Sequence, residues 1–376
     1  MTDNNSRQTA STHLPWIDAM RFIAAFLVMF CHSKNDFFMN YDKLPADEQG
    51  PVAFVFYVLT RLGPEAVFVF FIISGFLVGG IGLERIFRGT FRLGDYAVNR
   101  TVRIGLPLVA AIVLYGIVTL VTPSQWSWLT ALGNLLSLQC ILCDSLVSPF
   151  WSLSYEVWFY VVLFALALAF SNKYKVWGFL LFVLCCLVYT RMNPLYLLYW
   201  LMGAVAWLCR PKRPSRLMLV LSLVMTVATL GLSQMTSESH AMPTNIGMSR
   251  TVATVLMCFS FALLTQQIVL FSPSFVPGRL NVTWKTERLF SRLADFSYTL
   301  YLTHRIVFLV VFEYIFEKYQ GTLCPRDLLH YSLLVISTLV IAWLISLVSE
   351  KHTAPVRRWI KARLFRRLPA AEVPHR

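Results

Sequence analysis

The chain has 376 residues, of which 57% are hydrophobic and 14% charged, and its formal net charge is +14. Water-soluble domains of this length rarely contain so large a hydrophobic share, so the composition excludes that class and indicates a membrane protein. The basic residues lie in short loops between apolar stretches, which argues against nucleic acid as their partner.

Ten apolar segments are predicted to be transmembrane helices, because crossing the hydrocarbon core takes roughly 20 apolar residues. They lie near 15–33, 65–82, 104–122, 150–170, 176–190, 195–209, 217–234, 251–271, 297–316 and 329–349. Segments near 52–60 and 128–138 are too short to span and are predicted to be interfacial or re-entrant. The expected fold class is therefore an all-α polytopic membrane protein of about ten transmembrane helices.

Alternate loops of this arrangement carry most of the Lys and Arg residues, as cytoplasmic loops do. Both termini are therefore predicted to be cytoplasmic. Residues 1–14 form an N-terminal tail, 15–350 the transmembrane domain, and 351–376 a basic C-terminal tail. The tail around 357–366 is predicted to be an amphipathic helix lying on anionic lipid.

Three ionisable residues lie inside the first apolar segment, where such groups are costly and mark functional sites. At 100° per residue, the eleven-residue separation puts Arg21 and His32 on nearly the same helix face, about 16 Å apart along the axis. Asp18 lies about 40–60° from that face. Two structural alternatives remain, an Asp18–Arg21 pair at the inner interface and a core role for His32.

Glu156 lies about two turns into the fourth apolar segment, at a depth that we expect to match that of His32. A carboxylate bonded to one imidazole nitrogen would raise the basicity of the other, as a general base requires. The alternative role for Glu156 is a charge at a helix N-terminus, which the helix dipole favours.

Two arginines, Arg100 and Arg103, stand three residues apart at the start of the third apolar segment. Such a pair suits the phosphates of an anionic donor, although an ordinary basic inner loop would look the same. Near the other end of the chain, His304 and Arg305 are adjacent in the ninth segment and point about 100° apart. We expect His304 to face the site.

The eight cysteines are scattered, most of them within apolar runs, where they act as small hydrophobic residues. Cys31 is next to His32 and is expected to point away from it, which disfavours a Cys–His dyad. Cys140 and Cys143 form a CxxC in a predicted outer loop and are candidates for a local disulfide. No metal site is expected, because no further ligands lie near them.

Five separated motifs resemble those of the acyltransferase-3 family of membrane acyltransferases, over about residues 14 to 350. They are Ile17-Asp18-Ala19-Met20-Arg21 with His32, Phe70-Phe71-Ile72-Ile73-Ser74-Gly75-Phe76, Arg100 with Arg103, Trp151-Ser152-Leu153 with Glu156, Phe159 and Tyr160, and Ser297-Tyr298 through His304. Ile17 and Met20 are conservative departures from the family pattern. Each motif alone is weak, and five in the same order are specific.

The resemblance implies an acyl-coenzyme A donor, usually acetyl-coenzyme A, and no metal. It implies a hydroxyl acceptor on a cell-surface polysaccharide such as O-antigen, or on its lipid-linked precursor, and residence in the bacterial inner membrane among lipids. By resemblance, Arg100 and Arg103 hold the donor while Arg21 and His32 act in catalysis. The remaining site-lining candidates are Asp18, Ser74, Trp151, Ser152, Tyr298 and His304. Among these, Ser74 is expected mainly to pack between helices.

The expected mechanism has His32, supported by Glu156, removing the proton of a sugar hydroxyl that attacks the thioester carbonyl. Direct transfer is preferred, and an acyl-histidine step stays open. A competing interpretation is a transporter or flippase of lipid-linked sugars, since intramembrane charges also line transport paths. A third is an O-acyltransferase that acts on a small molecule or a lipid.

Overall fold

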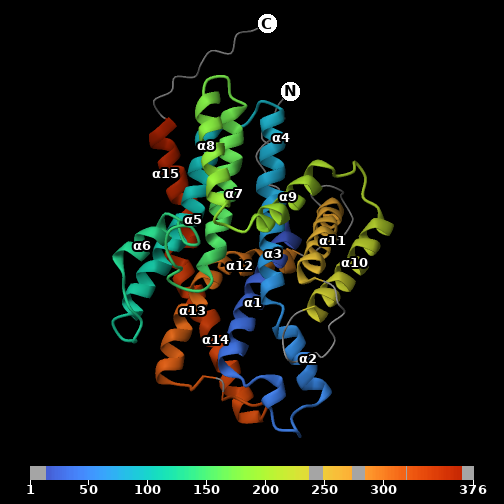
Figure 1. Cartoon of the computed structure of the whole chain (residues 1–376), viewed down its shortest axis with the longest axis vertical. Helices are drawn as coiled ribbons and strands as arrows, with labels where there is room; N and C mark the ends of the chain where they lie inside the picture. Colours follow the sequence, from blue (N-terminus) through green and yellow to red (C-terminus); the bar gives the residue numbers. More distant parts are fainter. Residues whose placement is uncertain (1–13, 237–248, 273–283, 319, 366–376) are drawn as a thin grey trace.

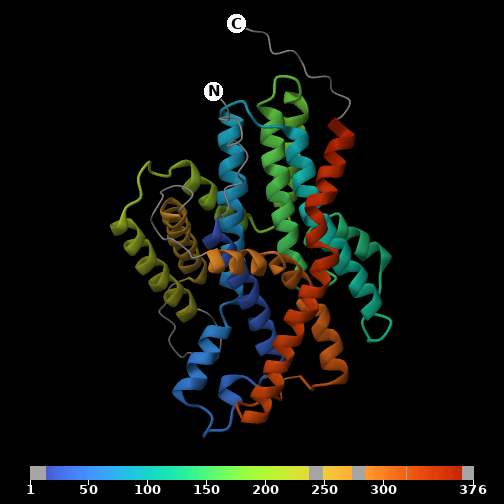
Figure 2. The same cartoon turned by 180° about the vertical axis from the view of Figure 1, so that it is seen from behind.

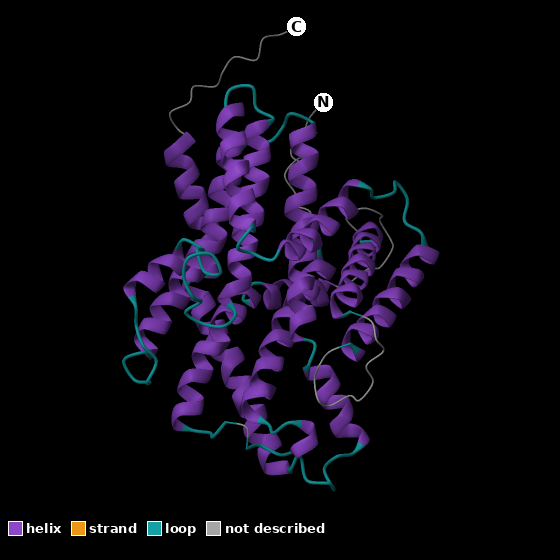
Figure 3. Cartoon of the chain, in the orientation of Figure 1, coloured by secondary structure: helices purple, strands orange, loops and turns teal. Residues whose placement is uncertain are grey.

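The computed structural model describes residues 14–236, 249–272, 284–318 and 320–365. In these residues the regular structure is helical throughout, as Figure 3 shows. The first half of the described chain contains α1 Pro15–Phe37, η1 Tyr41–Lys43, α2 Pro51–Thr60, α3 Gly63–Ser74, the π-helix η2 Gly75–Gly80, α4 Ile81–Phe87, α5 Leu93–Val118, α6 Trp128–Leu135 and α7 Phe150–Ala169. The second half contains α8 Lys175–Tyr189, α9 Pro194–Leu208, α10 Arg216–Met235, α11 Arg250–Phe271, α12 Trp284–Ala294, α13 Ser297–Tyr314, α14 Pro325–Val348, η3 Glu350–His352 and α15 Thr353–Phe365.

Local sequence explains where several helices begin. Proline stands in the first turn of α1, α2, α3, α9 and α14, where its missing N–H costs nothing. Serine caps two others: the Ser127 hydroxyl accepts from the backbone N of Thr130 before α6, and the Ser215 hydroxyl accepts from that of Met218 before α10.

The all-α prediction is confirmed, and the number of long spans is smaller than ten. Seven helical runs within the described residues are long and apolar enough to cross a membrane, which makes this an integral membrane protein. The shorter apolar helices α8 and α9 fill two more of the predicted positions. They have 15 residues each, less than the roughly 20 that a perpendicular span needs. The tenth position is α13, in which Arg305 and Glu313 interrupt the apolar sequence.

The helices divide around α12, which lies across the middle of the molecule (Figures 1 and 2). On one side of it, α1, α13 and α14 extend toward the end that carries α2. On the other side, α4, α5, α7, α8 and α15 run side by side. Because α1 and α13 both begin near α12, their first turns face the start of the second group, and the charged residues of both groups meet there.

Backbone contact between the α3–η2 segment and α9 fixes one wall of this meeting point. A Cβ added at Gly75 would lie 1.8 Å from the Trp200 carbonyl oxygen, and one added at Gly203 would lie 2.1 Å from the Ile72 carbonyl oxygen. Only glycine permits such an approach. The π-helix begins at Gly75, directly after Ser74, and π-helical turns are frequent at functional sites.

The C-terminal basic segment forms the helix that was predicted, and its contact with anionic lipid stays a prediction. Helix α15 forms as predicted and packs along α5 (Figure 1). An ion pair of 2.6 Å between Lys361 and Asp95 of α5 fixes it there. The predicted cytoplasmic N-terminal tail and the end of the basic tail, 1–13 and 366–376, lie outside the described residues.

Candidate active site

A cavity of about 100 Å³ lies where α1, α3, η2, α5, α7 and α13 meet. Its polar lining residues come from five helices that are far apart in the sequence, and they are Arg21, Ser74, Arg100, Arg103, Glu156, Tyr160, Ser297 and Tyr298. Phe70, Ile73, Leu77, Val78 and Ile104 complete the wall. Six of the eleven site residues singled out from the sequence therefore line one buried space.

Glu156 is oriented by a chain of hydrogen bonds. The Tyr160 hydroxyl donates to Glu156 Oε1 at 2.5 Å. Because that proton is used, the Tyr160 oxygen accepts from the Ser74 hydroxyl at 3.2 Å, and Ser74 in turn accepts from Trp200 Nε1 at 3.3 Å. Ser74 thus does more than the packing expected of it, since its hydroxyl connects α9 to the carboxylate. Trp200 was missed because nothing in the sequence near it signals a site.

The charge in the cavity is predominantly positive. Arg21, Arg100 and Arg103 line it together with the single carboxylate of Glu156. Arg21 also interacts electrostatically with Asp18 and with Glu350. An anion that enters this cavity would meet more positive than negative side chains.

Glu350 is a site residue that the sequence analysis missed. Its carboxylate accepts from the backbone N of Thr299 at 3.0 Å and from its hydroxyl at 2.6 Å, which stabilises the start of α13. It also lines an adjoining cavity with Arg21, Arg103 and Arg357. The available signal was a carboxylate at the end of the last apolar segment, directly before the basic tail.

Two histidines form a pair with a defined proton arrangement. His32 Nδ1 lies 2.9 Å from His304 Nε2, and His304 Nδ1 lies 3.0 Å from the Leu300 carbonyl oxygen. A carbonyl only accepts, so Nδ1 of His304 carries a proton, and in the neutral ring Nε2 accepts from His32 Nδ1–H. The lone pair of His32 is therefore on Nε2, which has no hydrogen-bond partner among the described residues. That arrangement is the one a general base needs.

The partner of His32 differs from the expected one. Glu156 was expected to support it, whereas the structure bonds Glu156 to Tyr160 and His32 to His304. His304 thus contacts His32 and does not line the cavity itself, and its role in the site stays a prediction. The adjacent Arg305 points elsewhere and forms an ion pair with Asp36.

The histidine pair and the arginine cavity lie along the same two helix faces. On α1, Arg21 and His32 share a face about 16 Å apart, and on α13, Ser297 and His304 are seven residues, or about 10 Å, apart on one face. His32 does not line the cavity itself. The Tyr301 ring bridges the two places, since its centroid lies 6.3 Å from that of His304 and 5.6 Å from that of the lining residue Phe70.

Two predicted lining residues lie behind the cavity wall. The Ser152 hydroxyl bonds to the Tyr301 hydroxyl and so holds the bridging ring in place. Trp151 packs in an aromatic cluster with Tyr155 and Tyr196, with ring centroids 5.8 and 5.4 Å away. Both residues support the site from outside the cavity.

The cysteines near the site show no catalytic geometry. A Cβ added at Gly63 would lie 2.7 Å from Cys31 Sγ, so Cys31 packs against the start of α3, and the structure gives it no contact with the imidazole of His32. Cys140 and Cys143 are free thiols whose backbones bond N to O at 3.2 Å. Partial desolvation by neighbouring groups raises the pKa of both thiols, so they are less reactive than ordinary cysteines at neutral pH.

The fold and this site define an integral membrane protein with a positively charged cavity inside an apolar helix bundle. Residues 14–347 match the family profile described as acyltransferase domain, and the chain belongs to this acyltransferase-3 family of membrane acyltransferases. It is similar to the acyltransferase MdmB of Streptomyces mycarofaciens, with 29% identity over 154 residues. That match spans 39% of this chain and 38% of the length of MdmB. No solved structure gives a significant match.

Proposed function

We propose that this protein is an O-acyltransferase that moves an acetyl group from acetyl-coenzyme A to a hydroxyl of a cell-surface polysaccharide or its lipid-linked precursor. In this proposal it resides in a bacterial inner membrane with both termini cytoplasmic. Membership of the acyltransferase family supports the class of reaction. The observation that carries the proposal is the pairing of His32 with His304, which leaves Nε2 of His32 as a free base on the helix face that also carries Arg21.

The donor is proposed to bind with its phosphates near Arg100 and Arg103, and its thioester arm extends past Arg21 toward His32. Nε2 of His32 takes the proton of the acceptor hydroxyl as the oxygen forms a bond to the thioester carbonyl carbon. The carbon–sulfur bond then breaks, and the departing thiolate receives that proton. The products are the acetyl ester and free coenzyme A. Direct transfer is preferred to an acetyl-histidine intermediate, since one base suffices for it.

The hydrogen bonds around these residues support distinct roles for them in this proposal. His304 acts as a positioning residue, because it fixes the tautomer of His32 without touching the substrate. Glu156, held by Tyr160, balances part of the positive charge of the arginines. The donor is therefore bound less tightly than by arginines alone, so that coenzyme A can leave after the reaction.

The test is mass spectrometry of surface glycans from cells that carry the wild-type protein, His32→Ala or His352→Ala. We expect an acetyl mass increment with the wild type and with His352→Ala, an exposed histidine outside the site. Loss of the general base should lower the rate about 10²- to 10⁴-fold in His32→Ala. Glycans that carry the same acetyl content in all three strains would refute the proposal.

Substrate movement measured in membrane vesicles distinguishes the proposed enzyme from a transporter. Substrate movement that requires no acetyl-coenzyme A and is lost in His32→Ala would assign transport instead. Acetylation of an added small molecule or lipid, with unchanged glycans, would keep the chemistry and change the acceptor.

A further inference from the structure

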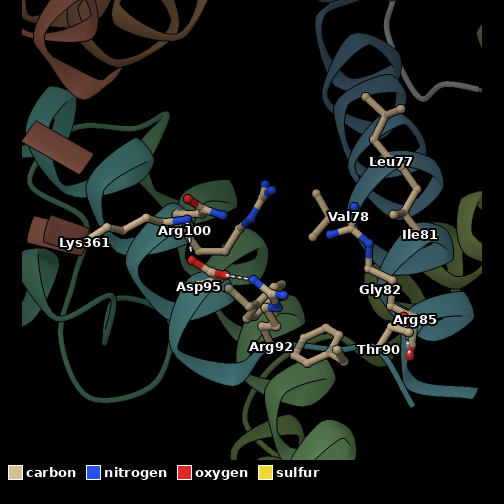
Figure 4. A pocket seen from close by; sticks show the side chains of 13 residues that line it. Leu77, Val78, Ile81, Gly82, Arg85, Thr90, Arg92, Asp95, Arg100 and Lys361 are labelled. Atoms are coloured by element: carbon tan, nitrogen blue, oxygen red, sulfur yellow. Dashed lines mark hydrogen bonds and ion pairs between the residues drawn. The ribbon is translucent and has the colours of Figure 1, made fainter. Parts of the chain in front are cut away.

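A second cavity, of about 290 Å³, lies between the η2–α4 segment, the loop that follows it, α5 and α15. Four cationic side chains line it, namely Arg85, Arg92, Arg100 and Lys361. Figure 4 shows that they come from facing walls, with Arg85 on the α4 side and Arg100 and Lys361 across the space. Arg85 and Lys361 line the same cavity although they lie at positions 85 and 361 of the sequence.

The charges in this cavity are not balanced by its own residues. Asp95 is the one carboxylate in the lining, and it is shared by Lys361 at 2.6 Å and Arg92 at 3.9 Å. Nε and Nη1 of Arg100 are buried without a hydrogen-bond partner, as is Oδ1 of Asn99. Buried polar atoms are rarely left unpaired, and an unpaired guanidinium nitrogen calls for an acceptor. The lining therefore fits an anion with several oxygens.

Two aromatic rings in the lining and a connection to the first cavity further restrict the class of ligand that fits. Phe91 and Tyr96 also line the space, with ring centroids 5.1 Å apart, and aromatic side chains of this kind stack on nucleobases. Arg100, Leu77 and Val78 line both this cavity and the one that holds Arg21 and Glu156. A ligand with phosphates here can therefore extend an arm toward the site.

We propose that this cavity binds the phosphorylated nucleotide portion of the coenzyme A thioester, with Arg85, Arg92 and Lys361 as phosphate ligands beside Arg100. The inference rests on the proposed function and deepens it. Helix α15 is then a wall of the donor site, and Asp95 positions Lys361 on it. The basic C-terminal segment thus serves substrate binding.

The test measures binding of adenosine 3′,5′-bisphosphate and of coenzyme A by calorimetry, with the purified full-length protein in neutral-lipid nanodiscs. Lys361→Ala and Arg85→Ala should each weaken both ligands by about tenfold or more, the usual effect of losing one charged hydrogen bond. Lys361→Arg should retain binding. Arg358→Ala removes the same charge from an exposed position of α15 that does not line the cavity, and should bind as the wild type does.

Pantetheine, which lacks the nucleotide and its phosphates, is the probe for specificity. Its affinity should be the same in the wild type and in Lys361→Ala. Equal weakening of pantetheine binding in Lys361→Ala would overturn the proposed nucleotide site. Unchanged binding of adenosine 3′,5′-bisphosphate in both alanine variants would overturn it as well. So would displacement of the nucleotide by phosphatidylglycerol nanodiscs, which would assign the cavity to a lipid headgroup.

The two proposals fail in different ways. Acetylation by a wild-type protein whose coenzyme A affinity does not depend on Arg85 or Lys361 removes the nucleotide site and leaves the enzyme. A protein that binds adenosine 3′,5′-bisphosphate through these residues but acetylates no acceptor retains the site and removes the proposed reaction.

Discussion

His304→Ala is the change that tests the histidine pair most directly. The substitution removes the acceptor of the His32 Nδ1 proton, which lies 2.9 Å from His304 Nε2. Leaving a buried donor unpaired costs about 1–3 kcal/mol, so kcat should fall roughly 5- to 150-fold. Since His304 is proposed to touch no substrate, KM for acetyl-coenzyme A should stay unchanged. The assay is transfer of radiolabelled acetyl to isolated glycan by protein in nanodiscs.

A second variant separates positioning from packing, because His304 is 0% exposed and alanine leaves a cavity. His304→Gln places an amide oxygen near the former Nε2 position and should recover most of the lost rate. The double variant with His32→Ala should be no slower than His32→Ala alone, because the pair acts as one unit. Wild-type activity in His304→Ala, or additive losses in the double variant, would refute the tautomer argument.

Two further predictions concern packing and topology. Gly203→Ala should lower the thermal unfolding temperature, because its Cβ would lie 2.1 Å from the Ile72 carbonyl oxygen and overpacking costs about 1–3 kcal/mol. Gly231→Ala is the control and should leave the unfolding temperature unchanged, because the space around Gly231 is open. Equal unfolding temperatures of the two variants would contradict the close approach of α3 and α9. In single-cysteine proteins in intact cells, a membrane-impermeant maleimide should label exposed Cys140 and not Cys209, and the labelling should accelerate as the pH rises toward the raised pKa of the Cys140 thiol. Labelling of Cys209 alone would invert the proposed orientation.

The sequence motifs predicted the composition of the cavity better than its internal pairing. Periodicity placed Arg21 and His32 on one face of α1, and the structure keeps both on the face toward α13. It could not predict that Glu156 would lie level with Arg21. A residue's depth along its own helix is readable from the sequence, whereas the offset and tilt between two helices depend on how their side chains pack.

The number of transmembrane helices was likewise predicted only in part from the sequence. Hydropathy located all ten apolar segments, because each is a local property of about 20 residues. Whether a segment spans alone is decided by length and neighbours, and α8 and α9 are short helices that pack beside longer ones. The basic tail illustrates the point for charge: its helical form was predictable, and its contact with Asp95 was not.

The sequence by itself determined membrane residence, the all-α class, the family and most of the polar residues of the site. These follow from composition, local periodicity and short motifs. Only the tertiary structure decided that His304 is the partner of His32, that Tyr160 holds Glu156, and that Lys361 faces the same cavity as Arg85. Such contacts join helices that are far apart along the chain, and packing between helices, which no local pattern encodes, brings them together.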